Sequence, residues 1–375
     1  MLTVDLWFDK IKLTGKFHCN RQIAIARFME LIREDPGELT MSVIKVQDIA
    51  HVRYAAPDLA AMRMFLEDFG MKCFEAGGRL YGKGTDGRPF FHVTEPGKAE
   101  FLAVGFFARS IEDLEILATH DGVAVEDSTE PGGGKIVRLI DPDGYRVEIV
   151  AGQECAEPSI PTIRDPINTP EEKPRLNRPV RMKAGPSHPH RIGHTGLAVR
   201  DFRVSEKWYK DRFGLLTTNE FEIAKDVRSG AFLRVDLGDQ PADHHALALL
   251  QLPGGRRNLH AAFEVPNIDD LMLGHNHLKA KKHKAFWSLG KHILGSQVFD
   301  YWKDPFGNEL EHWTDGDVYT ADDPPTVETL QALVGAQWGP SLPTGVVPVG
   351  AAGWLLSTSV RLQRFFSRQS EGQNA

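Results

Sequence analysis

The sequence predicts an α+β fold made of two similar modules in tandem. Its 375 residues suit two or three domains, at roughly 150 residues per domain. The same order of strand, helix-cap and turn signals also occurs twice along the chain, as it does in duplicated modules. We place the modules at residues 41–152 and 190–315. A proline-rich, charged linker at 153–189 is expected to run irregularly over the surface.

Each module is predicted to begin with a strand that carries a histidine and leads to an aspartate. The two stretches read Ile-Ala-His51-Val-Arg-Tyr-Ala-Ala-Pro-Asp58 and Gly-His194-Thr-Gly-Leu-Ala-Val-Arg-Asp201. A carboxylate at this place can cap a helix, because it accepts hydrogen bonds from the first free backbone amides. Both predicted helices end at a Phe-Gly pair, where glycine adopts the left-handed conformation that stops a helix.

The second half of each module is predicted to form a strand, a capped helix and a hairpin. The strands run into Ser110-Ile-Glu-Asp-Leu and Asn267-Ile-Asp-Asp-Leu, in which serine and asparagine suit the N-cap position. Turns at Asp141-Pro-Asp-Gly and Asp304-Pro-Phe-Gly then connect alternating strands, as in a hairpin. Each module therefore contains two strand-helix-strands units.

Composition argues against several classes of protein. Lys and Arg number 44 and Asp and Glu 51, and the net charge of −7 leaves no strongly basic face for nucleic acid. Three cysteines are too few for a disulfide framework or a CxxC zinc site and suit a reducing compartment. No apolar run reaches the roughly 18–20 residues that span a bilayer, and the N-terminal region does not read as a signal peptide. We therefore expect a soluble, cytoplasmic protein that acts on a small molecule.

Two flanking segments have no counterpart in the repeat. Residues 1–40 are either an amphipathic helical arm or an over-called start that precedes the true first residue, Met41, and we favour the second interpretation. Residues 316–375 contain prolines and a short apolar stretch at Trp354-Leu-Leu, which predicts either a docking helix or a weakly ordered tail.

The repeat indicates which of the 15 histidines are candidate metal ligands. His194 and Glu311 of module two correspond to His51 and Glu148 of module one, and module two adds His260 on a third strand. Two imidazoles and one carboxylate leave three coordination positions open on a metal, as non-haem Fe(II) oxygen chemistry requires. The same set disfavours structural zinc, which prefers thiolates, and calcium, which prefers oxygen ligands.

A block in module two carries a family signature. It reads Gly290-Lys-His292-Ile-Leu-Gly-Ser-Gln-Val-Phe-Asp-Tyr301-Trp-Lys-Asp304-Pro-Phe-Gly307-Asn-Glu-Leu-Glu311. With this block, the sequence resembles the vicinal oxygen chelate superfamily and, within it, the type I extradiol ring-cleavage dioxygenases. The resemblance covers residues 41–315 and implies that each module is a pair of βαβββ units forming an incomplete barrel. Asp300 departs from the pattern, which has an aliphatic or aromatic residue there, and suggests a subgroup with an uncommon substrate.

The resemblance implies a metal held by His194, His260 and Glu311, which is Fe(II) or alternatively Mn(II). The implied reaction is the extradiol, or meta, cleavage of a substituted catechol by O2 in aromatic-compound degradation, and the implied enzyme is a homo-oligomer. Module one is expected to bind no metal, because Ala103 stands where module two has its middle histidine.

Three further residues receive roles from the resemblance. It implies that His245 is the acid-base residue, because an imidazole can take up the catechol proton and later return one. It implies that His292 and Tyr301 contact the substrate and the bound oxygen, where they can donate hydrogen bonds and stabilise charge. His244, by contrast, is expected to face solvent.

Two other functions remain open on the same fold. The first is a glyoxalase-like metal-dependent lyase or epimerase, although such enzymes usually distribute their ligands over two modules and the candidate ligands here fall in one. The second is a non-catalytic protein that binds an aromatic molecule.

Overall fold

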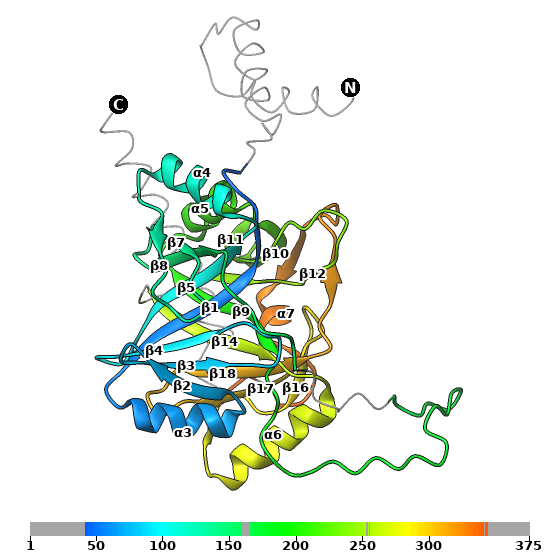
Figure 1. Ribbon diagram of the computed structural model, residues 1–375. Helices are drawn as coiled ribbons and strands as arrows, with labels where there is room; N and C mark the ends of the chain where they lie inside the picture. The colour runs from blue at the N-terminus through cyan, green and yellow to red at the C-terminus, as the bar shows by residue number, and fades with distance from the viewer. Residues whose placement is uncertain (1–41, 160–165, 253, 255, 341, 344–375) are drawn as a thin grey trace, which may run out of the picture. The chain divides into compact units, whose positions relative to one another are not determined.

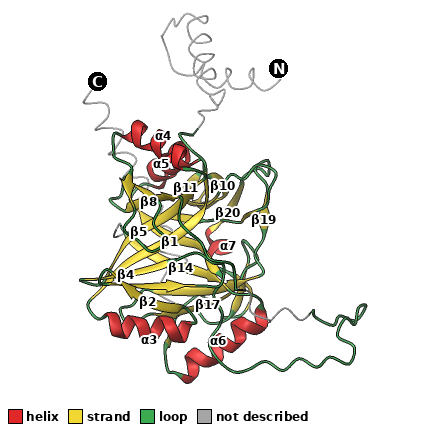
Figure 2. Cartoon of the chain, in the orientation of Figure 1, coloured by secondary structure: helices red, strands yellow, loops and turns green. Residues whose placement is uncertain are grey.

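The computed structural model describes residues 42–159, 166–252, 254, 256–340 and 342–343 (Figure 1). Strands dominate this part of the chain and few helices accompany them (Figure 2), so the predicted α+β class is confirmed. The interpretations offered for residues 1–40, Met41 and Trp354 lie outside the described residues. None of the helices in the described ranges has the length and apolar character needed to cross a membrane.

The first sheet has eight strands, in the spatial order β2-β3-β4-β1-β5-β8-β7-β6. Its central pair, β1 and β5, is antiparallel and joins two βαβββ units. On either side, β1 pairs with β4 and β5 pairs with β8 in parallel. The strands are β1 (Val46–Ala56), β2 (Lys72–Ala76), β3 (Arg79–Lys83), β4 (His92–Pro96), β5 (Glu100–Ala108), β6 (Glu126–Asp127), β7 (Lys135–Ile140) and β8 (Arg146–Ala151).

The second sheet repeats this arrangement with eleven strands, in the order β20-β10-β11-β13-β9-β14-β18-β17-β16-β21, with β15 paired to β17. Its central antiparallel pair is β9 and β14, and these pair in parallel with β13 and β18. The strands are β9 (Arg191–Val199), β10 (Leu216–Ala224), β11 (Val227–Arg234), β13 (Leu247–Gln251), β14 (Arg257–Glu264), β15 (Lys284–Ala285), β16 (Gly290–His292), β17 (Val298–Lys303), β18 (Glu309–Thr314), β20 (Thr326–Thr329) and β21 (Ala336–Trp338).

Four helices begin at the predicted cap residues. They are α3 (Leu59–Phe69), α4 (Ile111–Asp121), α5 (Phe202–Phe213) and α6 (Ile268–Ala280). The Asp58 carboxylate accepts hydrogen bonds from the backbone N–H groups of Ala60 and Ala61, each at 2.9 Å. Gly70 ends α3 at a φ of 106°, a conformation that glycine adopts without strain. The cap and stop signals of the sequence are thereby confirmed.

The second sheet continues beyond residue 315, where the sequence suggested only a tail. Strand β20 pairs with β10 and strand β21 pairs with β16, and the short helix α7 (Leu330–Val334) lies between them. A two-stranded ribbon of β12 (Ala242–Asp243) and β19 (Val318–Tyr319) also connects this segment to the second half. The linker, within its described residues 153–159 and 166–189, contains neither helix nor strand, as its prolines predicted.

The two halves share one buried apolar core. Phe69 of α3 stacks on the ring of His312 at 3.6 Å and meets Phe263 edge-on at 5.9 Å, both in the second half. The His312 ring nitrogen donates a hydrogen bond of 2.8 Å to the Phe69 carbonyl. Tyr145 donates a hydrogen bond of 2.8 Å to the carbonyl of Ala198 across the same boundary. The core therefore depends on both halves at once.

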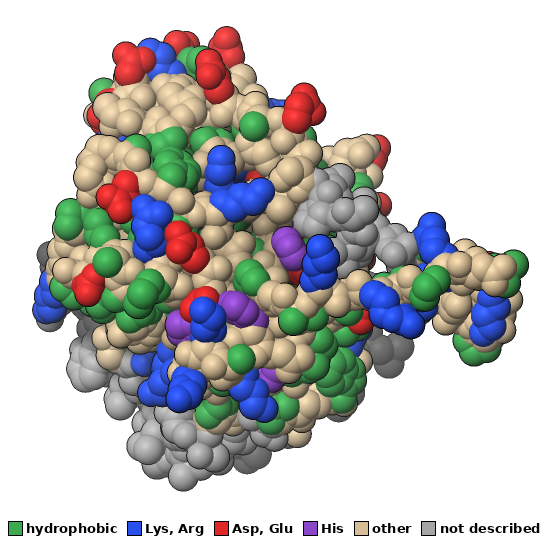
Figure 3. All heavy atoms as spheres, turned by 60° about the horizontal axis from the view of Figure 1, so that its bottom comes forward, with side chains coloured by type: hydrophobic (Ala, Val, Ile, Leu, Met, Phe, Trp, Pro, Cys, Tyr) green, Lys and Arg blue, Asp and Glu red, His purple; other side chains and the backbone are tan. Residues whose placement is uncertain are grey.

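Histidines also connect α3 and α6 at the surface, on the face that Figure 3 turns toward the viewer. The Asp68 carboxylate accepts hydrogen bonds from His277 at 3.0 Å and from His283 at 2.9 Å. These side chains are partly exposed, and they contribute to the contact with α3 rather than to the metal site described below.

We expect Phe69→Ala to lower the free energy of unfolding by about 3–5 kcal/mol, because it removes a buried ring that contacts both halves. The matched control is Met64→Ala on the same helix, where the side chain is 65% exposed and a change within about 0.5 kcal/mol is expected. Unfolding is followed by tryptophan fluorescence. Because the described tryptophans all lie in the second half, this signal reports whether a substitution in the first half destabilises the second. An unchanged midpoint in Phe69→Ala would show that the halves do not share a core.

Candidate metal centre

The side chains of His194, His260 and Glu311 converge from three adjacent strands of the second sheet. Strand β14, which carries His260, lies between β9 with His194 and β18 with Glu311. The Glu311 Oε2 atom lies 3.2 Å from His194 Nε2 and 3.5 Å from His260 Nε2. One ligand atom from each residue lies within 4.8 Å of the others, so a single cation could contact all three.

Several polar atoms of this group are buried without a hydrogen-bond partner. Both carboxylate oxygens of Glu311 and Nε2 of His260 have none, although Glu311 is fully buried. A buried carboxylate is costly unless a positive charge or hydrogen bonds compensate it. Burial would raise the pKa of Glu311, but the neighbouring His194 and His292 hold it well below its ordinary value. The residues therefore fit a divalent metal ion, and two imidazoles with one carboxylate suit Fe(II) or Mn(II).

His245 lies against this group on the segment that leads into β13. Its ring is 4.1 Å from the His194 ring and stacks on Phe232, also at 4.1 Å. Burial, and then the nearby histidines, lower the pKa of His245 well below its ordinary value, so the imidazole is neutral. A neutral imidazole has one nitrogen that can accept a proton.

His244 is buried, and the expectation that it faces solvent is wrong. It is 1% exposed, and its Nδ1 lies 2.9 Å from Nδ1 of His245. The His244 backbone is fixed on both sides, because its N–H donates to Asp317 and its carbonyl accepts from the Thr218 hydroxyl at 2.8 Å. One of the two δ nitrogens must donate the proton in this contact and the other must accept it. Alternation along a strand could not reveal this burial, because His244 precedes the strand.

His292 and Tyr301 form a second polar pair beside Glu311. The His292 ring nitrogen and the Tyr301 hydroxyl are 3.0 Å apart, and His292 Nε2 lies 3.6 Å from Glu311 Oε1. Burial and the nearby Glu311 raise the pKa of Tyr301 well above its ordinary value, so the phenol keeps its proton and can donate it in a hydrogen bond. The Trp287 ring is stacked against the Tyr301 ring, with 5.6 Å between their centroids.

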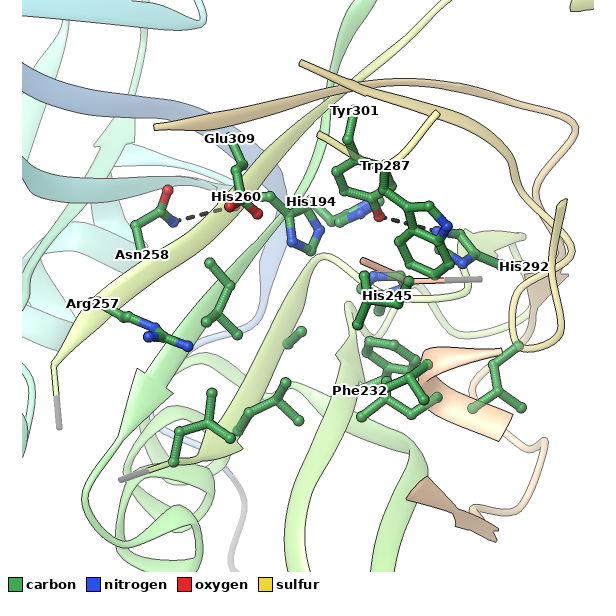
Figure 4. A pocket seen from close by; sticks show the side chains of 18 of the residues that line it. His194, Phe232, His245, Arg257, Asn258, His260, Trp287, His292, Tyr301 and Glu309 are labelled. Atoms are coloured by element: carbon green, nitrogen blue, oxygen red, sulfur yellow. Dashed lines mark hydrogen bonds between the residues drawn. The ribbon is translucent and has the colours of Figure 1, made fainter. Parts of the chain in front are cut away.

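A cavity of about 440 Å³ opens beside these residues (Figure 4). That volume is typical of a small-molecule site. Most of its wall is apolar, and polar side chains, among them Arg257, Asn258, Lys303 and Glu309, also line it. Four apolar lining residues come from the segment beyond residue 315 and were not anticipated, namely Leu330, Leu333, Val334 and Leu342. The apolar sequence Leu-Gln-Ala-Leu-Val at 330–334 was the available signal.

Asp300 does not line the cavity, contrary to the suggestion that its departure from the family pattern concerns the substrate. It is fully buried, accepts a hydrogen bond of 2.6 Å from the Trp302 indole, and lies 3.1 Å from the His275 ring nitrogen on α6. Successive residues of a strand point to opposite faces, so Tyr301 faces the cavity and Asp300 faces the helix.

Residues 191–312 match the Glyoxalase/Bleomycin resistance protein/Dioxygenase superfamily, and this part of the chain is a domain of it. Metapyrocatechase 2 of Cupriavidus necator is 26% identical over 308 residues, which cover 80% of this chain and 90% of that protein. An iron-dependent extradiol dioxygenase of Rhodococcus jostii is 23% identical over 297 residues, covering 73% and 90%. The predicted resemblance to this superfamily and its extradiol dioxygenases is confirmed.

Solved structures show the same fold. The Mn(II)-bound glyoxalase from Novosphingobium aromaticivorans has a TM-score of 0.64 and 22% identity, and the match covers 82% of this chain and 97% of that one. A variant of homoprotocatechuate 2,3-dioxygenase from Brevibacterium fuscum also has a TM-score of 0.64, with 18% identity and 78% coverage of each chain. These likenesses confirm the tandem-module architecture.

We expect Glu311→Gln to abolish metal binding, because the amide keeps the shape of the side chain but loses its charge. The loss should exceed the roughly 10–100-fold drop in affinity that follows removal of an outer-sphere partner. Glu309→Gln is the matched control, since Glu309 lies on the same strand and pairs with Lys303 at 3.0 Å. Equilibrium dialysis with Mn(II) measures both variants. Equal metal content in Glu311→Gln and the native chain would contradict the assigned centre.

Proposed function

We propose that the protein is an extradiol dioxygenase that cleaves a substituted catechol with O2 at a non-haem divalent metal. The observation that carries the proposal is the convergence of His194 and His260 on the buried, unpartnered Glu311 carboxylate, beside a cavity that these two histidines line together with His245 and Tyr301. An iron-dependent extradiol dioxygenase among the relatives favours Fe(II), and the manganese-dependent 2,3-dihydroxybiphenyl 1,2-dioxygenase of Geobacillus genomosp. 3 keeps Mn(II) as an alternative.

His194, His260 and Glu311 would hold the metal ion and leave positions on it for the diol and O2. Bound there, Fe(II) or Mn(II) would supply Lewis-acid chemistry with both reactants close together. The apolar wall of the cavity would contact the aromatic ring of the substrate. The cavity volume of about 440 Å³ exceeds what one unsubstituted ring requires. The substrate is accordingly a catechol with a ring substituent.

His245 takes up and returns the proton in this proposal. Its neutral ring lies against the ligand histidine, at the edge of the cavity, so it can accept a proton from a catechol hydroxyl held at the centre. For Nε2 to accept that proton, the neutral His245 ring must carry its hydrogen on Nδ1 and donate it to Nδ1 of His244, which lies 2.9 Å away.

Tyr301 and His292 stabilise the substrate oxygens. The Tyr301 phenol is protonated and lies beside Glu311, where it can donate a hydrogen bond to a substrate oxygen. His292 holds the phenol in place at 3.0 Å and can share the charge that develops there. Assembly into a homo-oligomer stays a prediction.

The proposed activity is tested with protein loaded with Fe(II) under anaerobic conditions and then mixed with O2 and catechols. Monocyclic, bicyclic and carboxylated catechols should be screened, and we expect O2 uptake together with a yellow ring-opened product from at least one class. A hemithioacetal serves as the parallel substrate for the glyoxalase alternative. Turnover of the hemithioacetal and of no catechol would replace the proposal with that alternative, and metal binding without either reaction would leave a binding protein.

We expect His245→Gln to lower turnover by roughly 10²–10⁴-fold, the usual contribution of a positioned acid-base group, while the metal stays bound. His283→Gln is the control, because that histidine lies at the α3–α6 surface and pairs with Asp68. Steady-state O2 uptake and metal content are measured on the same samples. Full activity in His245→Gln would rule out its role as the proton acceptor.

A further inference from the structure

The two sheets differ in the residue pair that faces across their central strands near the metal centre: one pair contains a histidine and the other an arginine. In the second sheet, His260 of β14 pairs across the central strands with Gly196 of β9. In the first sheet, Ala103 of β5 pairs with Arg53 of β1 at the equivalent register. Both β1 and β9 positions lie two residues after the histidine that begins each repeat. The large residue of the pair is therefore Arg53 on β1 in the first sheet, whereas in the second sheet it is His260 on β14, the counterpart of β5.

Space explains why the two arrangements exclude each other. A Cβ atom added at Gly196 would lie 3.2 Å from Cε1 of His260, so a side chain there would press on the ligand ring. In the first sheet, Ala103 has only a methyl group, which leaves room for a long side chain at position 53. Arg53 uses that room and is 1% exposed.

The Arg53 guanidinium reaches the glutamate that corresponds to Glu311. Its Nη2 donates to Glu148 Oε2 at 3.0 Å and its Nε donates to the same oxygen at 3.3 Å. That oxygen also accepts a hydrogen bond of 2.7 Å from Nε2 of His51, the counterpart of His194. Glu148 is 1% exposed, its Oε2 accepts these three hydrogen bonds and its Oε1 lies 3.1 Å from Nε of Arg146, whereas the oxygens of Glu311 have no hydrogen-bond partner.

Further acidic residues fix the guanidinium. Nη1 of Arg53 donates to Glu95 at 3.0 Å, and Nη2 donates to Glu130 at 2.9 Å. Burial would raise the pKa of Glu148, but His51 and Arg53 hold it well below its ordinary value. A guanidinium keeps its charge at any physiological pH, so this compensation requires no bound ion.

The groups proposed to handle protons and substrate are also replaced. Register places Phe90 where the second half has His245, because the carbonyls of Phe91 and Ala246 accept the equivalent backbone hydrogen bonds on β1 and β9. Arg138 pairs with Glu148 across β7 and β8, as Tyr301 pairs with Glu311 across β17 and β18. The first sheet thus keeps the framework of the site without its chemistry.

We infer that the first half carries a copy of the metal centre in which the Arg53 guanidinium permanently occupies the place of the metal ion. It follows that the chain binds one metal ion and that exchanging the pair at positions 53 and 103 would create a second metal site. The inference rests on the proposed metal role of the Glu311 group.

The test gives positions 53 and 103 of the first sheet the glycine and histidine that the second sheet has at Gly196 and His260. It is made in a chain whose metal centre at Glu311 has been removed. Full-length Glu311→Gln protein should bind no Mn(II), and adding Arg53→Gly and Ala103→His together should restore about one Mn(II) per chain. Adding Ala103→His alone should restore none, because the guanidinium remains. A further Glu148→Gln change should abolish the restored binding. Equilibrium dialysis gives the stoichiometry, and circular dichroism verifies the fold of each variant.

Two outcomes would overturn the inference: a folded triple variant that binds no Mn(II), or binding already present with Ala103→His alone. If the triple variant does not fold, Glu148→Gln in the otherwise native chain decides the question. That variant should keep its metal content and lose thermal stability, whereas loss of metal would show that the first half holds the ion. Failure of the proposed function is distinguishable, because a native chain that binds Mn(II) but cleaves no catechol would overturn the dioxygenase activity and leave the Mn(II) results for the restored site unchanged.

Discussion

The negative charge of Glu311 lies at the centre of the second sheet with no hydrogen-bond partner, and the surrounding residues are arranged about it. Two imidazoles face it from neighbouring strands, and two further polar groups, His292 and Tyr301, approach its other side. A charge buried in this way is costly unless a cation or hydrogen bonds compensate it, and the carboxylate has no hydrogen bonds. The geometry of the cavity and the proposed chemistry both follow from the requirement for that cation.

The duplicated fold meets this requirement in two ways. The central strand pairs have equivalent registers in the two sheets. Each sheet also carries a buried histidine on one central strand and a buried glutamate on the strand beside the other. The first half compensates its glutamate with Arg53, a side chain that is always charged. The second half has Gly196 at the corresponding position, and in the proposed function an ion and a substrate take the place of the arginine side chain. The shared core, in which Phe69 packs on His312, connects the half that contains Arg53 and Glu148 to the half that contains the Glu311 group.

Much of this could be predicted from the sequence, because caps, glycine stops and hairpin turns are local signals. Asp58 and Gly70 bound α3 as expected, and the repeat identified three residues that the fold brings together. Burial of His244 could not be predicted, because it results from backbone bonds to residues distant in sequence. The strands beyond residue 315 also depend on pairing with distant partners, and their short length left little periodic pattern. The role of Arg53 required the register of the strand pairs, which no single-sequence pattern specifies.

The fate of molecular oxygen tests the central claim most directly. Iron-loaded protein should be mixed with a catechol that it turns over, under an atmosphere of ¹⁸O₂, and the product analysed by mass spectrometry. An extradiol dioxygenase places both atoms of O2 in the ring-opened product, so we expect two labelled oxygens, allowing for exchange with solvent water. A ring-intact product such as a quinone, with no labelled oxygen, would contradict the account.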